Sequence, residues 1–335
     1  MATEFLPKFL KSQLLITPPA PITSCAGKTI LVTGSNTGLG KEAARQFAYL
    51  GASTIILAVR DMSKGETAKK DIEASLAGDK TKNPNPDIEV WHLDMASYAS
   101  VKSFASRANA LPRLDAVVLN AGIQTLKFAL AEGDESTLTV NVISTFLLGV
   151  LLLPVLERTA KTVGRKTNLS ILSSDLLFIA PLKERKTAVW EEEGVFAAMR
   201  NGDMDGRQRY MDSKLLDAFA ARELAKTRPV DKGVVINYLT PGWCHSELSR
   251  EQQGVGQRVA MRLLARTTEV GGRTLVHGAL SGEETHGLFL MDCEITAPGG
   301  LVNCKEGKVL QEKVWRELRA KLENIEPSVA GILNA

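Results

Sequence analysis

Short apolar runs rich in β-branched residues alternate with longer segments of helical periodicity along most of the chain. Periodicity and turn signals predict strands at Thr29–Thr33, Thr54–Val59, Glu89–Leu93, Ala116–Leu119, Asn168–Leu172 and Val234–Tyr238. The helical segments between and after them include Leu39–Leu50, Ser63–Leu76, Ala99–Leu111 and Tyr210–Lys226. Repeated strand–helix–strand order predicts an α/β fold: a single doubly wound parallel sheet with helices on both faces.

The alternation weakens at both ends and in one internal stretch. Residues 1–26 form an N-terminal extension, in which a short amphipathic stretch precedes the stiff sequence TPPAP. Residues 27–250 make up the predicted core, and the charged, irregular stretch 181–209 is an insertion in it. Residues 251–335 contain further helical stretches, which we expect to pack on the same domain as walls and a lid above the strand ends. These stretches lie around Gly256–Arg266, Glu269–Ala279 and Gln311–Leu322.

Composition narrows the classes of function. The 335 residues carry 41 basic and 38 acidic side chains, a net charge of +3, which excludes a strongly charge-driven nucleic-acid binder. The four cysteines have no CxxC spacing, so neither a zinc ribbon, nor another metal site, nor a disulfide scaffold is indicated. We therefore expect a reduced, cytoplasmic protein.

No part of the sequence predicts an integral membrane segment or a secretory signal. The longest apolar run, Phe146–Leu156, has eleven residues and includes a glycine and a proline, whereas a spanning helix needs about 20. We expect this run to be a buried core helix. Charged residues interrupt the amphipathic stretch 4–15, which we expect to dock on its own domain rather than on a membrane.

A glycine-dense turn joins the first predicted strand to the first predicted helix. It contains Gly34, Gly38 and Gly40, and glycine allows both positive φ and close approach of a ligand to the backbone. The following helix N-terminus offers unpaired N–H groups to an anion. The turn therefore predicts a nucleotide pyrophosphate site, although a plain tight β–α connection has a similar pattern. Its predicted cofactor-binding residues are Gly34, Ser35, Asn36, Gly38, Leu39 and Gly40.

The end of the second predicted strand bears on the choice of nicotinamide cofactor. NAD sites usually have an acidic residue there, which binds the ribose 2′-hydroxyl. Here Arg60 is the first charged residue and Lys64 follows four positions later, a pair suited to a 2′-phosphate. NADP(H) is therefore favoured over NAD(H). The alternatives are that Asp61 binds the ribose, or that Arg60 is solvated and pairs with Asp61 or Glu66.

The Gly-x-x-x-Gly-x-Gly spacing resembles that of the short-chain dehydrogenase/reductase family, which has a Rossmann-like fold. The resemblance implies that Asp94 lies beside the adenine ring and that Asn120, in Asn-Ala-Gly, stabilises the sheet beside the cofactor ribose. It also implies that Pro241 faces the nicotinamide and that Ser246 takes the place of the family's threonine. Asp94 and Asn120 also fit a turn without a ligand, and Asp94 also fits a helix N-cap.

Tyr210 and Lys214 are spaced i and i+4, which places both on one face of a helix. With Ser174 at the end of a strand and Asn141 in an earlier helix, they resemble the family's catalytic set. The resemblance implies that Tyr210 is the acid–base group and that Ser174, rather than Ser173, donates a hydrogen bond to the substrate oxygen. Lys214 would acidify Tyr210 and reach the nicotinamide ribose, and Asn141 would hold a water in a proton relay.

The chemistry of carbonyl reduction and alcohol oxidation explains these residue types. A tyrosine that acts as a base near pH 7 needs its pKa lowered by about three units from about 10, which is about 4 kcal/mol. An ammonium roughly 4 Å away supplies about that much at an effective dielectric constant near 20. We therefore expect Lys214 to lower the pKa of Tyr210.

The resemblance covers roughly residues 28–250. The long stretch between Ser174 and Tyr210 resembles the retinol-dehydrogenase-like branch, and this insertion and the extension look most like fungal members of secondary metabolism. They imply an NADP(H)-dependent oxidoreductase that interconverts a ketone and a secondary alcohol on a small apolar metabolite. Alternatives are an epimerase, a dehydratase, a cyclase or a cofactor-sensing binding protein.

Further positions permit two interpretations each. Trp190, Phe196 and Met199 fit either a pocket lining or an anchor for the insertion. Trp243 and His245 are candidate pocket residues, although His245 fits a solvent-facing turn better. The helix 137–156 corresponds to a homodimer face in many family members, but a buried helix has the same pattern.

Overall fold

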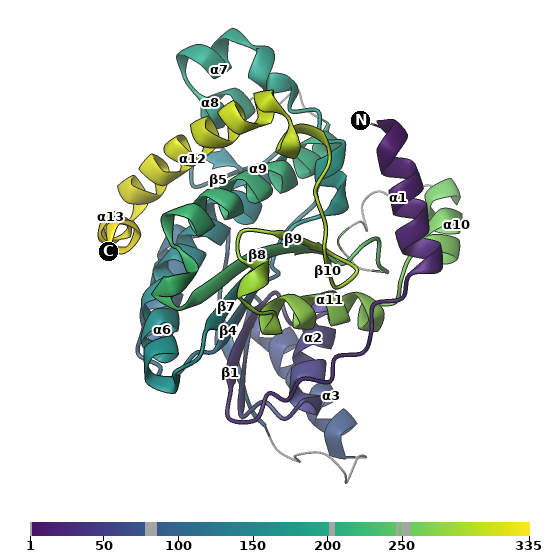
Figure 1. Ribbon diagram of the computed structural model, residues 1–335, viewed down its shortest axis with the longest axis vertical. Helices are drawn as coiled ribbons and strands as arrows, with labels where there is room; N and C mark the ends of the chain where they lie inside the picture. The colour runs from purple at the N-terminus through teal and green to yellow at the C-terminus, as the bar shows by residue number, and fades with distance from the viewer. Residues whose placement is uncertain (1, 78–85, 201–204, 246–247, 249–254) are drawn as a thin grey trace.

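The computed structural model describes residues 2–77, 86–200, 205–245, 248 and 255–335. An eight-stranded sheet crosses its centre in the order β10-β9-β8-β7-β4-β1-β2-β3 (Figure 1). Neighbouring strands are parallel except for the antiparallel pair β9 and β10. The strands are β1 Thr29–Thr33, β2 Thr54–Val59, β3 Asp87–His92, β4 Ala116–Leu119, β7 Thr167–Leu172, β8 Val234–Thr240, β9 Phe289–Met291 and β10 Glu294–Ile295, and a separate hairpin pairs β5 Leu130–Ala131 with β6 Asp134–Glu135.

Helices cover both faces of the sheet, so the predicted doubly wound α/β fold is confirmed (Figure 1). One face packs on α2 Gly38–Tyr49, α3 Met62–Ala77 and α11 Thr268–Leu280. The other packs on α4 Tyr98–Asn109, α6 Thr145–Val163 and α9 Gly206–Thr227, with α12 Lys305–Ile325 and α13 Ser328–Asn334 outside them. The remaining helices are α1 Ala2–Leu15, α5 Ser136–Leu138, α7 Ala188–Glu192, α8 Val195–Met199 and α10 Val255–Leu264, with one π-helical segment, η1 Thr139–Ser144, and the short 3₁₀ turns η2 Asp175–Phe178, η3 Lys183–Lys186, η4 Val230–Lys232, η6 Glu283–Thr285 and η7 Gly300–Asn303.

The six predicted strands are present, with small shifts at their ends, but the sequence did not predict β9 and β10. These two strands have three and two residues, too short for a periodic signal. β9 is buried and extends the parallel sheet beside β8, whereas both residues of β10 are exposed. The strand order reverses between β1 and β4, and a crevice at such a point is where open α/β sheets bind ligands.

The insertion 181–209 is more regular than its composition indicated. It contains η3, α7 and α8, and its last residues begin α9. Trp190, Phe196 and Met199 are buried in the hydrophobic core, so they anchor the insertion. α12 holds it from outside, because Lys313 donates to the Trp190 carbonyl and the Glu317 carboxylate accepts from the Val195 amide.

The apolar run 146–156 is a buried core helix, as predicted. It belongs to a continuous helix, Ser136–Val163, which is long and apolar enough to cross a membrane. However, 94% of its most apolar window is buried inside the protein. Within the chain, α4 and α13 pack against α6, so they cover part of its surface.

Candidate active site

The glycine turn after β1 has the geometry that a pyrophosphate site requires. Gly34 and Gly38 have φ of +65° and +57°, a conformation that favours glycine. Gly40 has no room for a side chain, because a Cβ there would lie 2.5 Å from Asn120 Nδ2 and 2.6 Å from the Gly34 carbonyl oxygen. Thr37 precedes α2 without a side-chain cap, which leaves the first N–H groups of the helix available to an anion.

The other predicted residues of this turn differ in how free their side chains are. The Ser35 hydroxyl is buried and donates to the Val32 carbonyl at 2.9 Å, so it shapes the turn and leaves only its backbone for a ligand. Leu39 extends toward α11, where a Cβ on Gly271 would lie 2.5 Å from its Cδ2. Asn36 remains partly exposed.

Arg60 and Lys64 lie at the carboxyl end of β2, beside the glycine turn. The Gly34 amide donates to the carbonyl of Ala58, two residues before Arg60. Asp61 accepts a hydrogen bond from the Lys64 amide and so caps α3. Both Arg60 and Lys64 are exposed, and among the described residues neither side chain has an ion-pair or hydrogen-bond partner. The proposed pairing of Arg60 with Asp61 or Glu66 is not observed.

The remaining predicted cofactor residues lie on the same carboxyl edge of the sheet. Asn120 donates from Nδ2 to the Thr33 carbonyl at 2.8 Å, which links β4 to the glycine turn. Asp94 accepts from the Ala96 amide, whereas the N-cap of α4 is Ser97. Pro241 follows β8 and is buried. Ser246 lies outside the described residues.

Ser174, Tyr210 and Lys214 come together at the carboxyl ends of β7 and β8. Tyr210 lies in the first turns of α9, and the Lys214 ammonium lies 5.8 Å from the centre of its ring. Lys214 Nζ also donates to the carbonyl of Leu172, the last residue of β7, at 2.8 Å. The Ser173 hydroxyl donates to the Lys214 carbonyl, which leaves Ser174 as the serine beside Tyr210.

Asn141 lies in the π-helical segment η1, and π-helical turns often occur at functional sites. Its side-chain oxygen accepts from the Ile123 amide at 2.8 Å, and its Nδ2 donates to the Ser213 hydroxyl at 3.0 Å. Ser213 in turn donates to the Tyr210 carbonyl. Asn141 thus connects the loop after β4 with the helix that carries Tyr210.

The electrostatics of this group correct one expectation. Burial raises the pKa of Tyr210, and although the ammonium of Lys214 lowers it, the carboxylates of Asp217 and Asp175 raise it further. The pKa of Tyr210 is therefore above its ordinary value instead of near 7. Burial also lowers the pKa of Lys214, but Asp217 and Tyr210 raise it, so the net shift is upward and the side chain stays charged.

Sequence reasoning missed three buried charged residues around this site. Asp217 accepts from Lys214 Nζ at 2.9 Å, and the i,i+3 spacing of the two residues was a signal for this pair. Asp175 directly follows Ser174 and accepts from its hydroxyl at 3.3 Å. Arg266 pairs with Asp292 at 2.6 Å, 26 residues away, and no local pattern indicates that contact.

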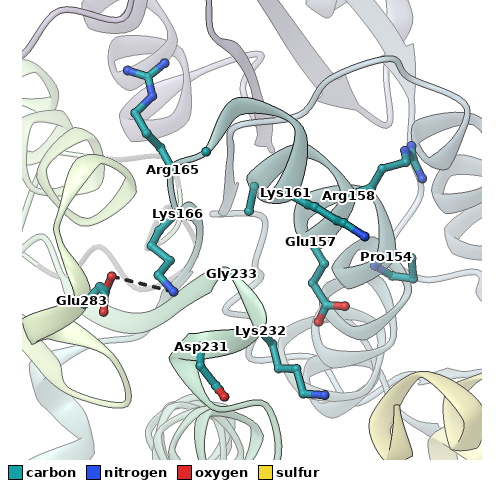
Figure 2. Close-up of a pocket in the computed structure, with 12 residues that line it drawn as sticks. Pro154, Glu157, Arg158, Lys161, Arg165, Lys166, Asp231, Lys232, Gly233 and Glu283 are labelled. Carbon is teal, nitrogen blue, oxygen red and sulfur yellow. Dashed lines mark ion pairs between the residues drawn. The ribbon is translucent and has the colours of Figure 1, made fainter.

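A hollow of ≈ 800 Å³ lies at the opposite edge of the sheet, where β7 and β8 begin (Figure 2). Charged side chains of both signs line it, and Lys166 and Glu283 form an ion pair across it. Its lining contains none of the predicted site residues. The lining residues are Pro154, Glu157, Arg158, Ala160, Lys161, Gly164, Arg165, Lys166, Asp231, Lys232, Gly233 and Glu283.

Residues 28–170 match the family model described as short chain dehydrogenase. The chain is 45% identical to the short chain dehydrogenase/reductase dmxR8 of Cryptosporiopsis sp., over 96% of this chain and 98% of that protein. It is 41% identical to the short-chain dehydrogenase anuD of Penicillium roqueforti, over 97% of this chain and 85% of that one. This chain belongs to the short-chain dehydrogenase/reductase family.

Solved structures share the fold of this chain. A short-chain dehydrogenase/reductase of Mycobacterium marinum superposes with a TM-score of 0.59 at 17% identity, over 84% of this chain and 98% of that one. The Pseudomonas aeruginosa RhlG/NADP active-site complex superposes with a TM-score of 0.58 at 21% identity, over 82% of this chain and 97% of that one. Membership establishes this chain as a short-chain oxidoreductase with a Rossmann-like sheet.

Proposed function

We propose that this protein is an NADP(H)-dependent reductase that converts a ketone of a small apolar metabolite to a secondary alcohol, and that the reverse oxidation uses the same residues. The observation that carries the proposal is the grouping of Ser174, Tyr210 and Lys214 at the switch-point edge, next to a glycine turn that fits a pyrophosphate. The proposed setting is the cytoplasm of a fungus and its secondary metabolism, in line with the fungal sources of dmxR8 and anuD. A homodimer is compatible with the proposal if it pairs through a surface other than the covered part of α6.

Each protein group has one task in this mechanism. When bound, the reduced nicotinamide supplies the hydride. Ser174 donates a hydrogen bond to the substrate oxygen, where negative charge develops during reduction. Tyr210 gives its proton to that oxygen, and its raised pKa keeps the phenol protonated at neutral pH, as a general acid requires. Lys214 stabilises the phenolate that remains.

The choice of NADP(H) rests on the free side chains beside the glycine turn. Arg60 is exposed at the end of β2 and has no partner among the described residues, so its guanidinium is available for a 2′-phosphate. Lys64 adds a second positive charge one helical turn later. Asp61 has another task, because its carboxylate caps α3.

The test follows absorbance of the reduced cofactor over a panel of ketones, with NADPH and with NADH. We expect consumption with NADPH, a preference of at least about tenfold over NADH, and a loss of roughly 10²-fold or more in kcat for Tyr210→Phe. A folded Tyr210→Phe enzyme with full activity would overturn the catalytic assignment. Consumption with NADH alone would overturn the assignment of the cofactor.

A further inference from the structure

The N-terminal helix α1 lies across the carboxyl edge of the sheet and bridges two loops of the candidate site. Phe5 packs edge-on against Phe178, with ring centres 6.2 Å apart, and Phe178 ends the turn that Ser174 caps. Phe9 packs against Trp243 at 6.3 Å, and Trp243 follows the turn after β8. Both loops follow the carboxyl ends of strands, β7 and β8, and open α/β sheets bind their ligands outside the carboxyl ends of the strands. α1 is therefore positioned beside the substrate.

Buried polar contacts fix the C-terminal end of α1 in this position. Arg266, whose side chain is 5% exposed, donates to the carbonyls of Ser12 and Ile16 at 2.7 and 3.2 Å. The same guanidinium pairs with Asp292, which also accepts from the Ser12 hydroxyl. Breaking one partner of such a buried pair is strongly destabilising, so this end of α1 is held firmly.

A second set of contacts joins α1 to the loop after β8 and to α10. Gln13 donates from Nε2 to the Trp243 carbonyl at 2.9 Å and to the Leu264 carbonyl, at the end of α10, at 3.4 Å. Figure 1 shows α1 and α10 side by side. A Cβ on Gly242 would lie 2.8 Å from Gln13 Oε1, so α1 contacts the turn directly.

The two faces of α1 differ in what they contact. Phe5 and Phe9 stack on each other, with ring centres 5.6 Å apart, and they are one helical turn apart on the face toward the loops. Both rings and Trp243 are only partly buried by the protein, so they keep apolar surface that a ligand can cover. On the other face Leu14 is 56% exposed.

We infer that α1 is a wall of the substrate site, on which Phe9, Phe5 and Trp243 recognise a flat aromatic or conjugated ring of the substrate. Aromatic faces and edges prefer planar aromatic partners, whose stacking adds to the simple burial of apolar surface. This inference rests on the proposed function for the identity of the reacting ketone. To the proposed function the inference adds that the substrate carries a flat ring beside the reacting ketone.

The test compares the binding of two ketones to the full-length protein with bound NADP⁺, which cannot reduce them, by titration calorimetry. The probes are 2-acetonaphthone and its saturated decalin analogue, which has a similar size but no flat ring. We expect the wild-type protein to bind the naphthyl ketone roughly tenfold more tightly, and Phe9→Ala to lose that roughly tenfold preference, or about 1.4 kcal/mol.

Three controls separate recognition from misfolding. Leu14→Ala removes apolar atoms from the exposed face of the same helix and should leave both affinities unchanged. Phe9→Trp should restore the preference, because it returns an aromatic ring to the position. The affinity for NADPH should be the same in all variants, since the ring contacts of Phe9 are with Phe5 and Trp243.

Two results would overturn the inference: equal binding of both ketones by the wild-type protein, or an unchanged preference in Phe9→Ala. Absence of NADPH consumption with every ketone is a different result. If the ring preference and its loss in Phe9→Ala were still observed, the proposed reduction would be overturned, but the role of α1 in binding the substrate ring would be supported.

Discussion

Lys214 serves two acidic neighbours at once. Its ammonium lies 5.8 Å from the Tyr210 ring and 2.9 Å from a carboxylate oxygen of Asp217. The other carboxylate oxygen of Asp217 is buried and has no hydrogen-bond partner among the described residues. Asp217 therefore holds the ammonium in place, but its negative charge offsets part of the effect of Lys214 on the phenol.

Asp217→Asn should shift the pH dependence of ketone reduction. The charged groups that influence Tyr210 are Lys214, Asp217 and Asp175, and removal of one negative charge lowers the pKa of the phenol. Reduction requires protonated Tyr210, so its alkaline decline should move to lower pH, by about one unit if the lost interaction is about 1.4 kcal/mol.

The measurement is the pH profile of kcat/KM for reduction between pH 6 and 11. Asp212→Asn is the matched control, because Asp212 lies on the same helix and is buried, but it bonds to the Leu182 amide instead of Lys214. A purely structural role for Asp217 would lower the rate at every pH without a shift of the profile, and that result would contradict the prediction.

At the scale of elements, periodicity was enough to predict the central strands and the helices between them. Val234–Thr240 begins with β-branched residues, so the sequence alone predicts a strand there. The structure buries every position of this strand. Phe289–Met291 has three residues and becomes a strand only because β8 offers an open edge. The sequence predicts elements whose signal is local and misses those that tertiary pairing creates.

The same distinction applies to the site. Tyr210, Lys214 and Asn141 lie in recognisable motifs, and the fold brings them to one region. In contrast, Arg266 bonds to segments 26 and 254 positions away, and nothing near it in the sequence indicates either contact. The docking of α1 beside the site therefore had no signal beyond its amphipathic character.

Because the residue after β4, Asn120, lies close to the glycine turn, Gly40→Ala tests the role of this turn in stability and in cofactor binding. Its Cβ would fall within 2.6 Å of the Gly34 carbonyl oxygen, a backbone atom, and closer still to the Asn120 amide. The turn must move, so we expect a loss of about 1–3 kcal/mol in unfolding free energy and at least about tenfold weaker NADPH binding.

Chemical denaturation and NADPH fluorescence titration measure the two effects. Gly331→Ala is the control, because Gly331 lies in α13 with open space at its Cβ position. Alanine favours a helix over glycine, so this variant should be as stable as the wild type or slightly more so. Normal NADPH affinity in Gly40→Ala would contradict the proposed role of the turn.

At the scale of the whole molecule, three buried carboxyl groups make stability depend on pH. Burial raises the pKa of Asp175 and of Asp217 to about 6 and that of Asp212 to about 7. Their folded pKa values exceed the unfolded value, so between these values the folded state binds more protons than the unfolded state. Stability therefore falls as pH rises through this window and recovers as pH falls.

We expect the melting temperature to be higher at pH 5.5 than at pH 7.5. Each proton taken up on folding contributes up to about 1.4 kcal/mol per pH unit, and His277 opposes this in part because burial lowers its pKa. Calorimetry at both pH values measures the effect. In Asp212→Asn the melting temperature should depend less on pH than in the wild type, because one of the three carboxyl groups is removed. A wild-type melting temperature that falls on acidification to pH 5.5 would contradict the assignment.

The position of α1 also has a consequence for synthesis on the ribosome. The Ser12 hydroxyl bonds to Asp292, a residue 280 positions later in the chain. At about 5–20 residues per second, the ribosome makes that partner some 14 to 56 s after α1. The polar contacts of α1 with Arg266 and Asp292 therefore form only after most of the chain has been made, so α1 is among the last parts to dock.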